Sequence, residues 1–274
     1  MIRLIQSYEE CREFAAGFQN DPSFSDPMLT NEEQLRSNLL DSIGRENRCA
    51  LGVYQENRMT GLFAFLVLPD EQYLEMLVGL SREKDAYLEV LGHLEQCYPG
   101  CNVDFVFNPG NILLKELLEQ REAEFWPEQQ KLVFTAPVFG LDTTGVELLS
   151  PQYTQLYCAM HSKDVYWTGE RVAAAQDRFH TFLAIHENRV VGYLDVTSAF
   201  DENEPYDLFV LEEYRKMGYG RKLLAKALEW NRPKGMAVLL DVDNAPAIHL
   251  YTSMGFVKEQ GQNNLTAHWQ IPNS

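Results

Sequence analysis

The stretch that decides the fold is DLFVLEEYRKMGYGRKLL, residues 207–224. It runs from an apolar segment through a basic loop with two glycines into a segment with apolar residues at helical spacing, which predicts a strand, a loop and a helix. The first N–H groups of a helix are unpaired and lie at the positive end of its dipole, so phosphate groups bind there. Gly218 and Gly220 leave these N–H groups uncovered. Alone, the pattern is equally compatible with a tight strand-to-helix turn.

A second stretch, LLDVDNAPAIHLYTSMGF, spans residues 239–256 and predicts a strand followed by a short helix. Asn244 is placed to cap that helix, Pro246 lies in its first turn and Gly255 ends it. The two stretches follow one another with one helix and one strand between them, and together they are far more specific than either alone.

Together the two stretches resemble the signatures of the GNAT superfamily of N-acetyltransferases. The first signature, Q/R-x-x-G-x-G/A, is met by residues 215–220. The second, N-x-x-A-x-x-x-Y-x-x-x-G-F, is met by Asn244, Ala247, Tyr251, Gly255 and Phe256. The resemblance extends from about residue 146 to the end of the chain and implies an α+β fold with a mixed sheet.

The resemblance implies that the second half binds acetyl-CoA as cosubstrate. The pantetheine arm would lie along the strand formed by Leu208, Phe209 and Val210, in the manner of an added strand. The remaining residues expected at the cofactor are Arg215, Lys216, Met217, Gly218, Tyr219, Gly220, Arg221, Asn244, Ala247 and Tyr251.

Tyr251 matches the family's general acid toward the CoA sulfur, although a tyrosine packed in a half-buried helix would fit the same pattern. Asp207 and Glu204 flank the strand beside the reacting carbonyl, and either is a candidate base. In so acidic a chain, solvated carboxylates are an equal alternative. Some relatives carry Glu at the position of Tyr206, which leaves the identity of the base open.

Relatives contact the acceptor between the first two helices of this half, where Tyr166, Trp167 and Glu170 lie. The aromatic residues would form a wall of the acceptor pocket and Glu170 would attract an ammonium group; packing of the aromatics in the core is the alternative. The six histidines show no ligand spacing such as HExxH, so we expect no metal.

The chain also repeats itself once. ENRMTG at residues 56–61 recurs as ENRVVG at residues 187–192, an offset of 131 residues. Each copy lies between strand-like runs and predicts a hairpin whose Asn forms the turn. We therefore expect two tandem GNAT-like domains with the order strand, helices, antiparallel strands, then βαβ: residues 1–135, a linker at 136–145, and a catalytic domain at 146–274.

The first copy lacks the cofactor loop. With the same offset, Tyr87 and Glu89 stand opposite Gly218 and Gly220, so bulk and negative charge replace uncovered backbone N–H groups. We expect residues 1–135 to be a degenerate copy that serves as a scaffold or as one wall of the acceptor cleft.

The charge and composition of the chain limit the kinds of binding partner that we expect. With 40 acidic and 23 basic residues the net charge is −17, which disfavours nucleic acid and favours a cationic acceptor. No apolar run is long enough for a membrane span, and the first residues do not resemble a secretory signal. We expect a cytoplasmic monomer or homodimer that acetylates a primary amine of a small molecule or peptide. The alternative is an acyl-CoA sensor without catalysis.

Overall fold

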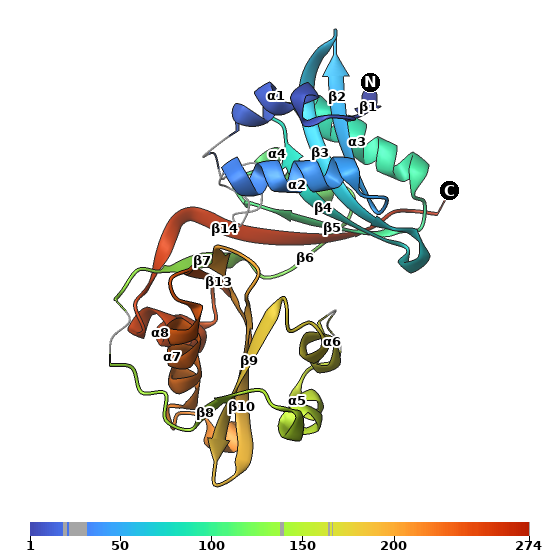
Figure 1. Cartoon of the computed structure of the whole chain (residues 1–274). Coiled ribbons are helices and arrows are strands. Elements are labelled where there is room, and N and C mark those ends of the chain that lie inside the picture. The colour runs from blue at the N-terminus through green and yellow to red at the C-terminus, as the bar shows by residue number, and fades with distance from the viewer. Residues whose placement is uncertain (19–20, 22–31, 138–139, 164, 166, 274) are drawn as a thin grey trace. The chain divides into compact units, whose positions relative to one another are not determined.

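A computed structural model describes residues 1–18, 21, 32–137, 140–163, 165 and 167–273 (Figure 1). The chain divides into two compact units. Unit 1 comprises Met1–Gln130 together with Gln260–Ser274, and unit 2 comprises Lys131–Glu259. Within the described ranges, none of the helices combines the length and the apolar character that a bilayer crossing requires.

Unit 1 is built on a mixed sheet. Its strand order is β1 (Ile2–Leu4), β2 (Arg48–Gln55), β3 (Arg58–Leu68), β4 (Tyr73–Leu80), β5 (Asn102–Phe107) and the second part of β14 (Phe256–Gln270), with β6 (Glu124–Phe125) paired to β14. Neighbouring strands are antiparallel except β4 and β5, which are parallel over Tyr73–Met76. Helices α1 (Arg12–Ala16), α2 (Glu32–Gly44), α3 (Lys84–Cys97) and α4 (Ile112–Glu119) complete the unit.

Alternation along the strands of unit 1 creates two cores, one on each face of the sheet. Leu62, Ala64 and Val78 pack with buried residues of α1 and α2, whereas Phe63 and Phe65 pack with buried residues of α3 and α4. The unit is therefore an α/β/α sandwich, and its central strands are apolar on both sides.

Unit 2 repeats this plan. An antiparallel sheet has the order β12 (Pro205–Val210), β10 (Arg189–Thr197), β9 (Phe179–His186) and β8 (Val146–Leu148). A further row comprises β11 (Glu202–Asn203), β13 (Gly235–Asp241), β7 (Gln129–Phe134) and the start of β14. Helices α5 (Thr154–Met160) and α6 (Gly169–Ala174) pack on one apolar cluster, and α7 (Tyr219–Asn231) and α8 (Ala245–Ser253) pack on the other.

The repeat found in the sequence is confirmed in the backbone. Glu56 and Asn57 link β2 to β3, Glu187 and Asn188 link β9 to β10, and all four residues have positive φ. Such a two-residue turn matches the right-handed twist of a hairpin. Both hairpins also contain a bulge, at Thr60 in the first copy and at Val191 in the second, again 131 residues apart. The two units therefore share turn, bulge and register.

The offset changes after the hairpins, and this corrects one sequence-based pairing. Helix α3 begins at Lys84 and α7 at Tyr219, so the helix starts are 135 residues apart. Glu83 rather than Tyr87 therefore stands opposite Gly218, and the pairing of Tyr87 and Glu89 with the two glycines is wrong. The same contrast remains, because an acidic residue occupies the position that precedes the helix in unit 1.

Tyr87, on α3, instead connects the residue after β4 with the residue that caps α4. Its side chain is fully buried. Its hydroxyl donates to the carbonyl of Ser81 at 3.2 Å and accepts from Nδ2 of Asn111 at 2.8 Å. Asn111 caps α4 as Asn244 caps α8. Protein groups thus satisfy one another at the place in unit 1 that corresponds to the α7–α8 region of unit 2.

The unit boundaries differ from the predicted residue ranges. Residues 260–274 were expected in the second domain, but they group with unit 1 because the end of β14 pairs with β5 from Leu265–Phe107 to Gln270–Asn102. Unit 2 begins at Lys131, within β7, rather than after a linker. Of the expected linker, residues 138 and 139 lie outside the described residues.

Candidate active site

A wedge opens in unit 2 where two neighbouring strands diverge. Strand β11 pairs in parallel with β13 only through Glu202 and Asn203, and β12 then continues as the edge strand of the other sheet. Oxygen Oε1 of Glu204, between β11 and β12, accepts from the backbone N–H of Leu239 in β13 at 3.4 Å. Glu204 therefore lies at the point where the wedge begins.

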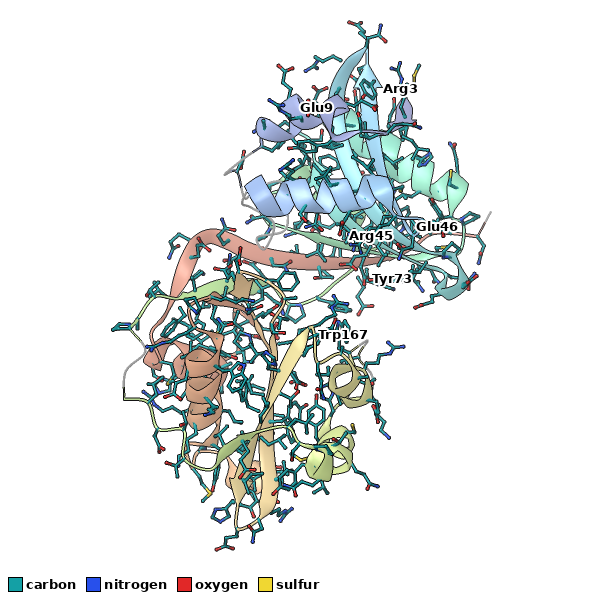
Figure 2. The ribbon with its side chains drawn as sticks, in the orientation of Figure 1. Arg3, Glu9, Arg45, Glu46, Tyr73 and Trp167 are labelled. Atoms are coloured by element: carbon teal, nitrogen blue, oxygen red, sulfur yellow. The ribbon has the colours of Figure 1, made fainter. Side chains whose placement is uncertain are left out.

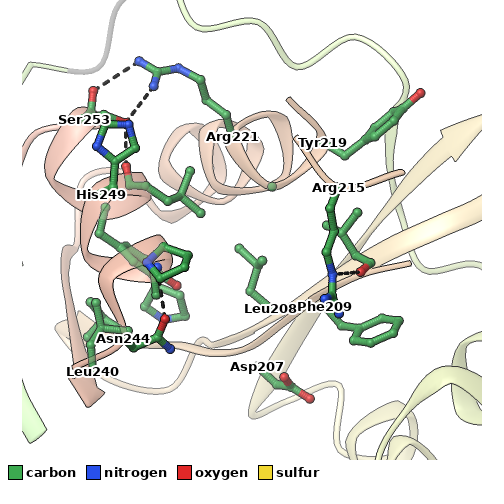
Figure 3. Close-up of a pocket in the computed structure, with 18 of the residues that line it drawn as sticks. Asp207, Leu208, Phe209, Arg215, Tyr219, Arg221, Leu240, Asn244, His249 and Ser253 are labelled. Carbon is green, nitrogen blue, oxygen red and sulfur yellow. Dashed lines mark hydrogen bonds between the residues drawn. The ribbon is translucent and has the colours of Figure 1, made fainter. Parts of the chain in front are cut away.

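The outer edge of β12 presents backbone polar groups to this wedge. The N–H of Leu211 donates to the carbonyl of Val191, so alternate residues of β12 direct their N–H and C=O groups toward β10. Leu208 and Val210 consequently direct theirs outward. Nε of Arg215 donates to the carbonyl of Val210 at 3.1 Å, which is one of these outward groups (Figure 3).

The wedge forms a cleft of about 1020 Å³. Its walls come from β12, β13, the loop before α7, the first turn of α7, and α8 along its length (Figure 3). The sequence-predicted residues that line it are Asp207, Leu208, Phe209, Val210, Arg215, Lys216, Gly218, Tyr219, Gly220, Arg221, Asn244, Ala247 and Tyr251. Met217, which was also predicted, is not among the lining residues, and its side chain is 56% exposed.

The loop before α7 leaves a row of backbone N–H groups uncovered. Lys216 has φ of 61° and Gly218 has φ of 89°, and this backbone shape turns successive N–H groups to one side. Within the described part of the chain, no hydrogen bond engages the backbone N–H of residues 218–221. The positive end of the α7 dipole and these N–H groups are the features that suit an anion.

The two glycines of the loop have different physical roles. At Gly218 the positive φ favours glycine, because a Cβ is strained there. At Gly220 a Cβ would lie 3.5 Å from Cδ2 of Leu250, an ordinary contact. The protein itself therefore tolerates alanine at position 220, as the G/A alternative of the sequence signature allows.

Two of the basic side chains near the loop are held by the protein. Arg221 donates to Oγ of Ser253 at 2.8 Å and to the carbonyl of Ser253 at 3.1 Å, which ties α7 to the end of α8 (Figure 3). Lys222 forms an ion pair with Asp142 at 3.2 Å. Arg215 and Lys216 add positive charge to the cleft lining.

Tyr251 and Asn244 take different positions on α8. Oδ1 of Asn244 accepts from the N–H of Ala247 at 3.2 Å, so Asn244 is the helix cap (Figure 3). Tyr251 lines the cleft, is only 3% exposed and packs edge-on against Phe256. Burial, with the nearby charges of Glu204 and Asp207, raises the pKa of Tyr251, and its phenol stays protonated at neutral pH.

The two candidate bases differ in exposure to the cleft. Asp207 lines it, and Glu204 is not among the lining residues. Oδ2 of Asp207 accepts from the hydroxyl of Tyr193 at 2.7 Å and lies 3.4 Å from Nε2 of His161. Asp207 is therefore the better placed of the two.

Of the predicted acceptor residues, Trp167 (labelled in Figure 2) and Glu170 lie outside the cleft lining, and Tyr166 falls outside the described residues. Trp167 packs against Phe179 with ring centroids 4.8 Å apart, and the guanidinium of Arg178 covers its ring at 5.1 Å. Glu170 is exposed in the first turn of α6, where backbone hydrogen bonding lowers its pKa. These contacts place Trp167 at the edge of the α5–α6 core.

Sequence reasoning missed a group of buried polar residues behind Asp207. Asp195 is fully buried and receives hydrogen bonds from Tyr157 at 2.8 Å and Thr181 at 2.5 Å. Nε2 of His161 lies 3.1 Å from its Oδ2. One signal was present in the sequence, since Asp195 is a lone acid in the otherwise apolar strand β10. Our expectation that the site holds no metal stays a prediction.

Comparison with known families agrees with this geometry. The family model described as an acetyltransferase (GNAT) domain matches residues 177–258, which contain β9 to α8 and the whole cleft lining. The match identifies an acetyltransferase (GNAT) domain within unit 2. No curated protein matches it in sequence.

Solved structures extend the GNAT fold over both units. A tandem GNAT protein from the clavulanic acid biosynthesis pathway, solved without acetyl-CoA, superposes with a TM-score of 0.67 at 12% identity, covering 100% of each chain. A GCN5-related N-acetyltransferase from Sphaerobacter thermophilus gives 0.69 at 12% identity, covering 100% of this chain and 96% of its own. A GNAT acetyltransferase from Colwellia psychrerythraea gives 0.59 at 12% identity, covering 98% and 99%. At these identities the likeness concerns the fold.

The contrast between the two glycines of the GNAT loop predicts opposite effects on stability. Gly218→Ala should destabilise the protein by roughly 1–2 kcal/mol, because alanine is strained at positive φ. Gly220→Ala should be neutral or stabilising by up to about 1 kcal/mol, because alanine favours the helix. Urea unfolding of the two variants and the wild type measures the difference. Equal stability of Gly218→Ala and the wild type would show that the loop backbone differs from this description.

Proposed function

We propose that this protein is an acetyl-CoA-dependent N-acetyltransferase that passes the acetyl group directly to a primary amine of a small molecule or peptide while both are bound. The observation that carries the proposal is the row of uncovered N–H groups at Gly218–Arg221 beside the outward edge of β12. One feature suits a diphosphate and the other an extended chain with amide groups.

The groups around the cleft are suited to acyl transfer. Outward N–H groups of β12 would face the thioester oxygen and stabilise the negative charge that develops on it. Tyr251, protonated through neutral pH, would give its proton to the sulfur that leaves. Asp207 would hold the acceptor and take, directly or through water, the proton that its nitrogen loses as the new C–N bond forms and the C–S bond breaks. The backbone of β12, Tyr251 and Asp207 would thus each have a separate task in acyl transfer.

Charge supports a cationic acceptor. The chain has a net charge of −17, while Arg215, Lys216 and Arg221 bring positive charge to the cofactor end of the cleft. An anionic cofactor and a cationic acceptor would therefore be attracted to different ends of the same cleft. We propose unit 1 as a scaffold without cofactor, since Glu83 precedes α3 and Tyr87 bonds Ser81 and Asn111 in the corresponding region.

Cofactor binding is tested by a matched pair at one position. Gly220→Glu places a carboxylate against the diphosphate and should weaken acetyl-CoA binding by at least roughly a hundredfold. Gly220→Ala adds only a methyl group, which makes an ordinary contact with Leu250. This variant should bind acetyl-CoA with an affinity within about threefold of the wild type. Isothermal titration calorimetry with acetyl-CoA measures both, with a stoichiometry of one per chain expected. Unchanged binding by Gly220→Glu would remove the assigned site.

Catalysis is tested at Tyr251. Tyr251→Phe removes the proton donor and should lower kcat by roughly a hundredfold or more while acetyl-CoA binding stays the same. The assay measures thiol release from acetyl-CoA with spermidine, lysine methyl ester and a peptide with a free N-terminus. Tyr153→Phe, outside the cleft lining, is the control. A wild-type protein that binds acetyl-CoA but releases no thiol with any amine would instead be an acyl-CoA sensor.

A further inference from the structure

The buried polar group behind Asp207 has no part in the mechanism so far. His161, at the end of α5, is 5% exposed, and Asp195, on β10, is fully buried. Nε2 of His161 lies 3.1 Å from Oδ2 of Asp195 and 3.4 Å from Oδ2 of Asp207. The imidazole therefore bridges a buried carboxylate and one that lines the cleft.

Both ring nitrogens of His161 face hydrogen-bond acceptors. Nδ1 lies 3.2 Å from the carbonyl of Ser162, which can only accept. Nε2 faces the carboxylate oxygens of Asp195 and Asp207. A neutral imidazole carries a proton on one nitrogen only and cannot donate in both directions. The geometry therefore favours the imidazolium form. Burial lowers the pKa of His161, but the hydrogen bonds to Asp195 and Ser162 and the two nearby negative charges outweigh it and raise the pKa overall.

The imidazolium explains how two carboxylates share this space. His161, Asp195 and Asp207 each contribute an atom, and these atoms lie within 4.8 Å of one another. Two carboxylates so close would repel, and one would bind a proton unless a cation lay between them. The other titratable groups in contact with His161 or near it are Tyr157, Cys158, Glu170 and Tyr193, together with Lys163, whose charge acts on Glu170. A cationic His161 is thus what allows both aspartates to be ionised.

The same contacts fix the orientation of Asp207. Tyr193 and His161 both contact Oδ2. Among the described residues, no hydrogen bond engages Oδ1, and the side chain is 33% exposed in the cleft lining. One carboxylate oxygen is therefore held by the protein and the other remains available to a ligand.

A bulge in β12 lies directly before Asp207. Asp195 pairs with Asp207 and Val196 with Pro205, so Tyr206 is the extra residue. Its ring packs against Phe179 at 5.8 Å, and Tyr206 is 41% exposed and lines the same cleft as Asp207. A carboxylate and an exposed aromatic ring in one cleft are suited to a primary ammonium group with an apolar body.

We propose that His161 is a positioning residue that keeps Asp207 ionised and oriented, so that Oδ1 of Asp207 receives the ammonium group of the acceptor with the ring of Tyr206 beside it. The proposal rests on the proposed function, because it names the binding mode of the amine acceptor. It assigns Asp195 the task of holding His161, and Thr181 and Tyr157 the task of holding Asp195.

The charge state is tested without any ligand. In full-length protein with 15N-labelled histidine, NMR should show His161 protonated on both nitrogens, with a pKa above the ordinary value of about 6.5. In His161→Gln with 13C-labelled aspartate, Asp207 should titrate at least one pH unit higher than in the wild type. His180→Gln, elsewhere in unit 2, is the control and should leave both aspartates unchanged.

A second variant allows the proposal to be tested even if His161→Gln does not fold. Asp207→Asn removes one negative charge at the edge of the cleft and should lower the pKa of His161. An ordinary or lowered pKa of His161 in the wild type, or aspartates in His161→Gln that titrate as before, would overturn the proposal.

Kinetics with n-butylamine link the charge state to the acceptor. In His161→Gln the acidic limb of kcat/KM for n-butylamine should move to higher pH by at least one unit, because the raised pKa of the aspartate leaves it protonated over a wider range. Binding of acetyl-CoA by calorimetry should not change. A wild-type protein that fails to bind acetyl-CoA would defeat the proposed function, whereas the NMR titrations would still decide the state of His161.

Discussion

The rest of unit 2 depends on one constraint: backbone polar groups are unpaired along the outer edge of strand β12 and at the start of helix α7. Strand β11 pairs with β13 through Asn203, β12 continues without that neighbour, and α7 begins with N–H groups that no carbonyl of the described residues accepts from. Unpaired backbone groups are costly when they are buried, so such an arrangement persists only where solvent or a ligand satisfies them. The cleft, the loop with positive φ at Gly218 and the exposed edge at Val210 all follow from that divergence.

Unit 1 has the same fold, but its strands at the corresponding position stay paired. The hairpin turn and its bulge are kept, but β4 and β5 stay paired over four residues and the hydroxyl of Tyr87 joins Ser81 to Asn111. These three residues satisfy one another through hydrogen bonds. The same architecture thus has bonded polar groups at this place in unit 1 and uncovered backbone N–H groups before α7 in unit 2.

Local chemistry was predictable from the sequence, and long-range contacts were not. The Asn turns, the cap at Asn244 and the glycine loop each depend on neighbouring residues, so a pattern of a few positions predicts them. The cluster of His161, Asp195 and Asp207 joins three separate elements, and only the sheet register brings them together. Pairing of the last strand with β5 and the four-residue change of offset before α7 depend on the fold in the same way.

The most direct test of the central claim is an NMR titration of the amide groups of 15N-labelled protein with coenzyme A and, in parallel, with pantetheine. Coenzyme A should shift the amide signals of Gly218, Tyr219, Gly220 and Arg221, because its diphosphate accepts hydrogen bonds there. Pantetheine, which lacks the diphosphate, should move the signals of Leu208 and Val210 but leave the loop signals in place. Loop signals that do not move with coenzyme A would contradict the account.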